Sequence, residues 1–143
     1  MIIFDLDRTL RDITASEHLE PQGIHRGINI NWHDWQHYVN NHGTPIESTV
    51  RLFNRVSPDI TVLTSSQFGT ASWLYRHGLY PADIVERHYD DTRTPFDYKV
   101  DFIQRHVDQI VLWVDDDTEV LDYVESLGIP TVRVTCGLRR DIL

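Results

Sequence analysis

Short runs of apolar residues recur along the chain, and each predicts a β-strand. Four of the runs are rich in β-branched residues and do not alternate with polar positions, the pattern of strands buried on both faces of a parallel sheet. A fifth run, residues 83–87, is weaker. The predicted strands cover residues 1–6, 60–64, 83–87, 110–114 and 131–135.

Between these runs, apolar residues recur at helical spacing. Residues 45–56 place four apolar side chains on one helical face, and Pro45 suits a first turn. The other predicted helices cover residues 70–77, 96–106 and 118–127. This alternation of strands and helices predicts a doubly wound, Rossmann-like parallel α/β sheet of about five strands, with helices on both faces and a minimal cap.

One long segment breaks the alternation. Residues 11–42 are polar, rich in histidine and asparagine, and lack a clean period except for a short predicted helix at 32–39. We interpret residues 11–42 as a small insertion near the predicted site. No repeat, low-complexity tract or linker marks a second domain, so we expect residues 1–143 to form a single domain.

Composition narrows the class of protein. The 143 residues are 41% hydrophobic, enough for one domain with a single core. The single cysteine, Cys136, excludes a disulfide framework and predicts a reduced thiol. No stretch has the length of a membrane span and no signal-peptide pattern opens the chain, so we expect a cytoplasmic protein. The net charge of −9 disfavours a surface that coats nucleic acids.

Polar side chains capable of chemistry gather where the predicted strands end. Carboxylates follow two of these strands, hydroxyl groups close a third, and a lysine opens one of the helices. Because ligands bind at the carboxyl ends of the strands in open α/β sheets, we expect these side chains to meet on one rim. They are Asp5, Asp7, Thr64, Ser65, Lys99, Asp115 and Asp116.

The residue types on this rim suggest a different chemical role for each group. Several carboxylates close together do not all stay ionised without a cation, and an oxygen-only set suits Mg²⁺. One carboxylate can then act as a nucleophile and a second as general acid and base. A hydroxyl and an ammonium can hold the oxygens of a transferring phosphoryl group. The set favours phosphoryl transfer through an aspartyl-phosphate.

At this point the chain resembles the haloacid dehalogenase (HAD) superfamily of phosphotransferases. FDLDRTL is similar to the first motif of that superfamily, VLTSS to the second, FDYKVDFI to the third and VLWVDDD to the fourth. The four stretches occur in the family's order and span nearly the whole chain. The resemblance implies that Thr64 binds the phosphoryl oxygens and that Lys99 steadies the nucleophile and the phosphate.

The first and fourth motifs carry the acidic residues. The resemblance implies that Asp5 is the nucleophile and a Mg²⁺ ligand, and that Asp7 is the acid/base with its backbone carbonyl on the metal. Asp116, with Asp115 beside it, would complete the metal site. The run of three acids leaves this register ambiguous by one residue, and we prefer Asp115 and Asp116 because Asp117 can cap the next helix.

Two departures from the family pattern concern substrate binding. Arg8 follows Asp7 where the superfamily usually has glycine, so its side chain must either point away from the phosphate or contact the substrate. Ser65 and Ser66 stand where relatives often have a Gly-Arg pair, which puts one phosphate contact in doubt. Neither departure removes a residue that the chemistry needs.

A narrower resemblance concerns the substrate. IVERHYDDTRTPFDYK is similar to the region before the lysine in 3′-phosphatase domains of phage-type polynucleotide kinases. There Arg87 and Arg93 would contact a phosphate or its flanking nucleotide, whereas no P-loop and hence no kinase half is present. A site covered only by the insertion accepts a large substrate. Trp32 of the insertion could stack on a base, whereas we expect Trp35 to pack in the core.

The favoured hypothesis is a Mg²⁺-dependent phosphohydrolase that removes 3′-phosphates from nucleic-acid ends. The alternatives are a phosphatase of nucleotides or other small molecules, and a catalytically idle HAD-like binding module. A zinc site at His33 and His37 is disfavoured, because no cysteine or HExxH pattern supports it. The sequence leaves the oligomeric state open.

Overall fold

A five-stranded parallel sheet forms the centre of the computed structural model, which describes residues 1–21 and 30–135. The strand order is β5–β4–β1–β6–β7, and every neighbouring pair is parallel. Each predicted strand is present, with ends that differ by a few residues. The strands are β1 (Ile2–Phe4), β4 (Ile60–Thr64), β5 (Asp83–Glu86), β6 (Leu112–Asp115) and β7 (Thr131–Arg133).

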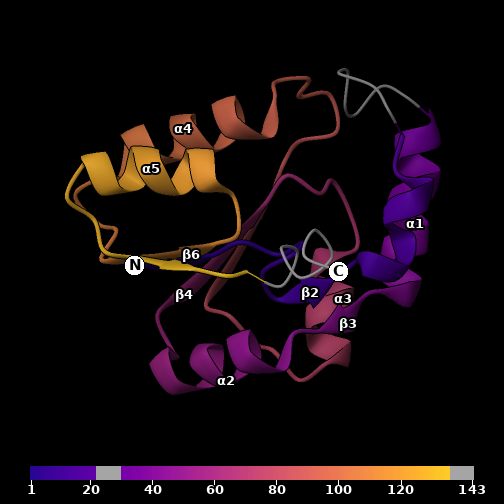
Figure 1. Cartoon of the computed structure of the whole chain (residues 1–143), viewed down its shortest axis with the longest axis horizontal. Coiled ribbons are helices and arrows are strands. Elements are labelled where there is room, and N and C mark those ends of the chain that lie inside the picture. The colour runs from indigo at the N-terminus through magenta and orange to yellow at the C-terminus, as the bar shows by residue number, and fades with distance from the viewer. Residues whose placement is uncertain (22–29, 136–143) are drawn as a thin grey trace.

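Helices cover both faces of the sheet, which confirms the predicted doubly wound α/β fold (Figure 1). On one face, α4 (Pro95–His106) and α5 (Thr118–Ser126) pack in a core cluster around Trp113. On the other, α2 (Glu47–Val56) and α3 (Thr70–Arg76) bury Phe53 and Trp73 against the sheet. The boundaries follow local signals, since Asp117 caps α5 and Gly78, at φ 74°, lies just beyond the end of α3.

The insertion is framed by a second, two-stranded sheet that the sequence pattern did not predict. β2 (Arg11–Asp12) pairs with β3 (Thr44–Pro45) in antiparallel register and so brings the two ends of the insertion together. Pro45 therefore lies in β3, not in the first turn of α2, which begins at Glu47.

Between these short strands the insertion forms η1 (Thr14–Leu19), a 3-10 helix, and α1 (Ile30–His42). Helix α1 extends beyond the predicted range 32–39 at both ends. The described part of the insertion has its own apolar cluster, made by Ile13, Trp32, Trp35 and Val39. Residues 22–29 of the predicted insertion, and Cys136, lie outside the described residues.

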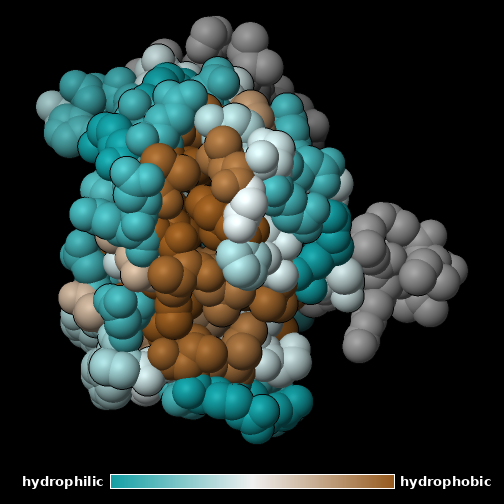
Figure 2. Space-filling model, turned by 90° about the vertical axis from the view of Figure 1, so that its left-hand side faces the viewer, coloured by the Kyte–Doolittle hydropathy of each residue, from teal (hydrophilic) through white to brown (hydrophobic). Residues whose placement is uncertain are grey.

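The two ends of the sheet differ in polarity. At the amino ends of the strands, hydrophobic side chains form a broad surface (Figure 2). Val111, just before β6, and Leu127, between α5 and β7, are 59% and 42% exposed. The polar side chains singled out from the sequence lie at the opposite, carboxyl end. Within the described residues, no helix is long and apolar enough to cross a membrane.

Candidate active site

A cavity of about 220 Å³ opens at the carboxyl ends of the strands, where the sequence predicted a site. Insertion residues, among them Trp32, Gln36 and Glu20, form part of its wall. Of the predicted site residues, Asp115 and Arg93 do not line it. Those that do are Asp5, Asp7, Arg8, Trp32, Thr64, Ser65, Arg87, Lys99 and Asp116.

Lys99 is a buried cation that lines this cavity. It lies near the start of α4 and is 4% exposed. Its ammonium donates to Asp5 Oδ1 at 3.0 Å and to Asp115 Oδ2 at 2.9 Å. Burial alone would lower the pKa of Lys99, but the two carboxylates outweigh it and raise the pKa above its ordinary value. Lys99 therefore stays charged and links the ends of β1 and β6.

Asp115 is the more deeply enclosed of the two aspartates that bind Lys99. Its Oδ2 accepts from Trp113 Nε1 at 3.0 Å as well as from Lys99, and its Oδ1 accepts from the backbone amides of Asp116 and Asp117. Burial would raise its pKa, yet Lys99 and these donors hold the pKa below the ordinary value. Asp115 thus acts as an ionised anchor that fixes the turn after β6.

Asp5 and Asp116 face each other across Thr9. The Thr9 hydroxyl lies 3.0 Å from Asp5 Oδ2 and 3.3 Å from Asp116 Oδ1, so it donates to one carboxylate at a time. Burial and the nearby charge of Asp115 raise the pKa of Asp5 well above its ordinary value, and burial raises the pKa of Asp116 to about 6. Lys99 alone does not balance the negative charge collected here.

This excess of negative charge fits a divalent cation. Asp5, Asp115 and Asp116 each offer a carboxylate oxygen, and these oxygens lie within 4.8 Å of one another. An all-oxygen set with no sulfur or imidazole matches the ligands that Mg²⁺ prefers. Because both Asp115 oxygens already accept two hydrogen bonds each, Asp5 and Asp116 are the better placed ligands. Asp7 is outside this set, so its carboxylate is not a ligand candidate.

Asp7 points instead toward a cation that the sequence reading missed. Arg11, the first residue of β2, donates from Nε to Asp7 Oδ1 at 2.6 Å. The spacing of four residues was visible in the sequence, but nothing local indicated that Arg11 would be buried. Arg11 does not line the cavity itself and reaches the site only through Asp7.

The ends of β4 and β5 supply hydroxyl groups and an arginine, respectively. Thr64 is buried, and its Oγ1 accepts from the amide of Ser66 at 3.0 Å, which leaves the hydroxyl proton to be donated elsewhere. Arg87, just after β5, is 2% exposed and donates to the carbonyls of Ser65 and Arg93 at 3.1 and 2.9 Å. The structure therefore brings Thr64, Ser65 and Arg87 together on one wall.

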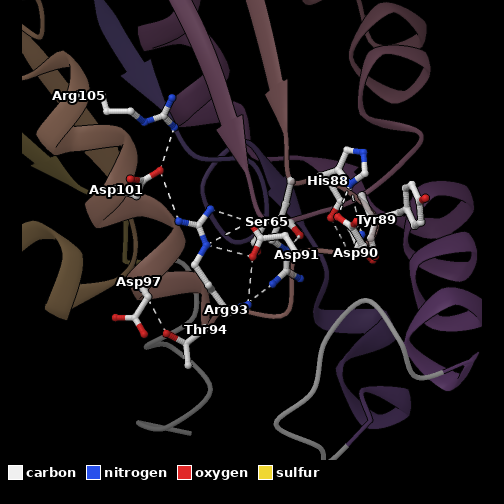
Figure 3. Close-up of polar contacts among 12 residues, drawn as sticks. Ser65, His88, Tyr89, Asp90, Asp91, Arg93, Thr94, Asp97, Asp101 and Arg105 are labelled. Carbon is white, nitrogen blue, oxygen red and sulfur yellow. Dashed lines mark hydrogen bonds and ion pairs between the residues drawn. The ribbon is translucent and has the colours of Figure 1, made fainter.

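Arg93 is held away from this wall. Figure 3 shows its guanidinium between Asp91 and Asp101, with ion-pair distances of 2.6 and 3.4 Å. It also lies 5.6 Å from the centre of the Tyr98 ring. The side chain predicted to contact substrate is thus outside the cavity in this structure, and Arg93 reaches the site through its carbonyl, which binds Arg87.

Arg8 and the insertion tryptophans Trp32 and Trp35 also line the cavity. Arg8 has a left-handed backbone, φ 65°, and its guanidinium pairs with Glu17 and Glu20. Trp32 packs edge-to-face against Trp35 at 5.6 Å and is only 2% exposed, so it is a wall of the cavity and not an open stacking surface. Trp35 packs as predicted and donates to the Ser16 carbonyl.

The two histidines that raised the question of zinc lie against an aromatic ring. The rings of His33 and His37 lie 4.8 Å apart, and both contact the ring of Phe68. Among the described residues, the one group of side chains spaced to hold a metal is the aspartate cluster at the cavity.

No protein-family model and no curated protein matches the sequence. Among solved structures, the chain is similar to one chain of a Pnkp1/Rnl/Hen1 complex, with a TM-score of 0.66 and 14% identity over 93% of this chain and 45% of that one. A chain of a Pnkp1/Rnl/Hen1 RNA repair complex gives a TM-score of 0.65 and 14% identity, over 93% of this chain and 41% of that chain.

A third similar structure is that of a "putative phosphoglycolate phosphatase" from Lactobacillus plantarum, with a TM-score of 0.60 and 12% identity over 96% of this chain and 86% of that one. The chain spans less than half the length of the two chains from the complexes. At this level of identity the likeness establishes the fold alone. The fold implied by the HAD resemblance is therefore confirmed.

Proposed function

We propose that this protein is a Mg²⁺-dependent phosphohydrolase that forms an aspartyl-phosphate on Asp5 and removes 3′-phosphates from nucleic-acid ends. One observation carries the chemistry: the carboxylate of Asp5 lies in a cavity beside Lys99, Thr64 and Asp116. This is the combination of nucleophile, oxygen-binding groups and metal ligand that phosphoryl transfer requires.

The residues suit a two-step reaction. An Asp5 oxygen attacks phosphorus, the bond from phosphorus to the leaving oxygen breaks, and Asp7 gives that oxygen its proton. Water then attacks the aspartyl-phosphate, Asp7 takes a proton from the water, and inorganic phosphate leaves with Asp5 restored. Lys99 and the Thr64 hydroxyl stabilise the charge on the phosphoryl oxygens. Bound Mg²⁺ would neutralise charge on the Asp5–Asp116 pair and on the phosphoryl group.

Support for a nucleic-acid substrate is of a different kind. Two chains of the same fold belong to complexes named for Pnkp1, Rnl and Hen1, one of which is described as an RNA repair complex. Arg87 is buried on the cavity wall beside the predicted phosphate position, where a cation favours binding of an anionic group.

One observation favours the second candidate, a phosphatase of nucleotides or other small molecules. Residues of the insertion close one side of a cavity that measures about 220 Å³, room for a small phosphorylated molecule but not for several nucleotides. The two candidates share every catalytic residue, so they differ only in what lies beyond the transferred phosphate.

Phosphate release from a 3′-phosphorylated oligonucleotide, compared with the matching 3′-mononucleotides, tests the proposal. Assays run with Mg²⁺, with EDTA and with the Asp5→Asn variant. We expect Mg²⁺-dependent release from the oligonucleotide that the variant loses. Release from mononucleotides alone would retain the mechanism and overturn the substrate, whereas no release from these or from an aryl phosphate would support an idle binding module.

A further inference from the structure

Arg11 is a buried cation, and Asp7 is its one charged partner within hydrogen-bond reach among residues 1–21 and 30–135. Its side chain is fully buried, and its Nε lies 2.6 Å from Asp7 Oδ1. Two backbone hydrogen bonds, from the Arg11 amide to Leu6 and from the Arg8 amide to Arg11, fix it to the same tight loop as Asp7. A buried guanidinium is costly unless paired, so this pairing persists whenever the loop is folded.

The far side of the guanidinium is held just as firmly. Arg11 Nη1 donates to Asn40 Oδ1 on α1 at 2.7 Å, and Asn40 Nδ2 donates to the Phe68 carbonyl at 3.1 Å. The guanidinium also lies over the ring of Trp73, 5.3 Å from its centre. Arg11 therefore links the insertion helix and the loop after β4 to the acidic loop after β1.

Two glycines leave the room that this arrangement needs. A Cβ at Gly43 would lie 2.6 Å from Arg11 Cδ and 2.9 Å from the Val39 carbonyl oxygen. A Cβ at Gly69, whose φ is +80°, would lie 2.2 Å from Asn40 Nδ2. A side chain at Gly43 would therefore collide with Arg11, and a side chain at Gly69 would collide with Asn40.

From this geometry we propose that Arg11 is a positioning residue for Asp7. By binding Oδ1 it fixes the rotation of the carboxylate and leaves Oδ2, to which no described residue donates a hydrogen bond, as the oxygen that carries the proton. Through Asn40 this orientation depends on α1, so the insertion acts on the proton-transfer step. The inference rests on the proposed function, in which Asp7 is the acid and base.

A role in proton transfer differs from a purely structural role in how it depends on the leaving group. An aryl phosphate with an activated phenol needs little protonation as it leaves, whereas a ribose oxygen needs a well-placed acid. The value of kcat/KM reports the steps up to transfer of phosphorus to Asp5, so hydrolysis of the aspartyl-phosphate does not enter. The informative quantity is the ratio of kcat/KM for a 3′-phosphorylated nucleotide substrate to kcat/KM for p-nitrophenyl phosphate.

The test uses two variants. Arg11→Lys keeps the positive charge but cannot donate to Asp7 and Asn40 from two nitrogens at once. Asn40→Ala keeps Arg11 but removes the amide oxygen that accepts from its Nη1. We expect the ratio to fall on the order of 10²-fold in Arg11→Lys and about tenfold in Asn40→Ala. Arg76→Gln is the matched control, because Arg76 donates to the backbone carbonyl of Asn40, whereas the hydrogen bonds of the Asn40 side chain are with Arg11 and Phe68. We expect that control to leave the ratio unchanged.

The possible results distinguish a failure of the proposed role of Arg11 from a failure of the proposed phosphatase function. If the wild-type protein is active and both substrates lose rate equally in both variants, Arg11 is merely structural and the inference is wrong. If Arg11→Lys does not fold, the ratio in Asn40→Ala decides the question. A wild-type protein inactive on both substrates would overturn the proposed function, and the inference with it.

Discussion

Two buried cations serve the two aspartates of the first motif, and they do so differently. Lys99 comes from α4 and contacts Asp5 and Asp115, with Asp116 close by. Arg11 comes from β2, contacts Asp7 alone among the carboxylates that the structure describes, and makes its second contact with a neutral amide. The first group of charges is negative overall, whereas the second is balanced.

The difference indicates what each region is for. Burial, together with the negative charge of Asp115, raises the pKa of Asp5 and brings that of Asp116 to about 6, so the Lys99 region gains by binding a cation. A balanced pair attracts no further ion but holds a carboxylate in one orientation. We therefore expect changes at the Lys99 region to alter metal binding and charge, and changes at the Arg11 region to alter geometry.

The largest expected effect comes from Asp5→Asn. The amide is nearly the same size but is no nucleophile, so phosphate release should fall on the order of 10³-fold or more. Thermal unfolding without Mg²⁺ should occur at an equal or higher temperature, because one of the crowded carboxylates is gone. Asp101→Asn, which alters an exposed ion pair outside the cavity, is the control and should retain activity. Substantial release by Asp5→Asn would rule out the aspartyl-phosphate.

Removing the cation itself should damage both function and stability. In Lys99→Met, Asp5 and Asp115 lose their shared partner, and an unpaired buried charge costs about 3–5 kcal/mol. We expect chemical denaturation at pH 7 to show this loss in the free energy of unfolding, with activity abolished. If Lys99→Met were as stable as the wild type, Asp5 and Asp115 would have to become protonated without any loss of folding free energy. That result would contradict the description of Asp115 as an ionised residue.

Local patterns were enough to predict the scaffold of this site. Each strand of the main sheet was recognisable from its own apolar run, and glycines such as Gly78 marked helix ends. Because parallel strands end on one edge, Thr64, Lys99 and Asp116 could be placed together before any contact was known. The pairing of β2 with β3 could not be predicted, since each is two residues long and the pairing joins positions 11 and 45.

The placement of three side chains depends on contacts that a sequence does not display. Arg93 follows Asp91 closely enough to be captured by it, and so does not enter the cavity. Trp32 turned out to be a buried wall because the insertion packs its own cluster. Arg11 gained its place from Asn40, which is distant in sequence and lies on a helix whose position no local pattern fixes.

An effect of intermediate size should appear in how stability depends on pH without Mg²⁺. The pKa of Asp116, about 6 in the folded protein against an ordinary 3.8, means that the folded state binds more protons than the unfolded state between these values. The contribution of Asp116 to stability is therefore lost as pH rises from about 4 to about 7. We expect the difference in unfolding free energy between Asp116→Asn and wild type to grow in favour of the variant over this range.

Mg²⁺ provides the matched condition for the same measurement. A cation that binds only the folded, ionised site stabilises the protein by mass action and should remove the advantage of Asp116→Asn at pH 7. Melting curves at pH 4 and pH 7, with and without Mg²⁺, distinguish these cases. If the stability difference between Asp116→Asn and the wild type depended on neither pH nor Mg²⁺, the Lys99 region would not be a cation-binding site.

The smallest effects come from two tryptophans, one beside each cation. Trp113 donates to Asp115, whereas Trp73 lies under Arg11 and donates to the Gly43 carbonyl. Replacing either with phenylalanine removes one hydrogen bond and some packing. At pH 7 the lost hydrogen bond should cost about 1 kcal/mol of stability in Trp73→Phe, whose acceptor is neutral, and about 1.5–3 kcal/mol in Trp113→Phe, whose acceptor is charged. Urea denaturation of both variants measures this cost.

Their pH dependence should differ, because only one of the two acceptors titrates. The pKa of Asp115 is lowered in part by Trp113, so that stabilisation is present above the ordinary value of 3.8 and is lost as pH falls through the folded value. The cost of Trp113→Phe should therefore be constant down to about pH 4 and shrink as pH falls below it, whereas the cost of Trp73→Phe, set by a carbonyl that does not titrate, should stay constant throughout. Equal pH dependence in the two variants would show that Asp115 is not ionised in the folded protein. The Lys99 region would then carry less negative charge than we infer, and its contrast with the balanced Arg11 region would be wrong.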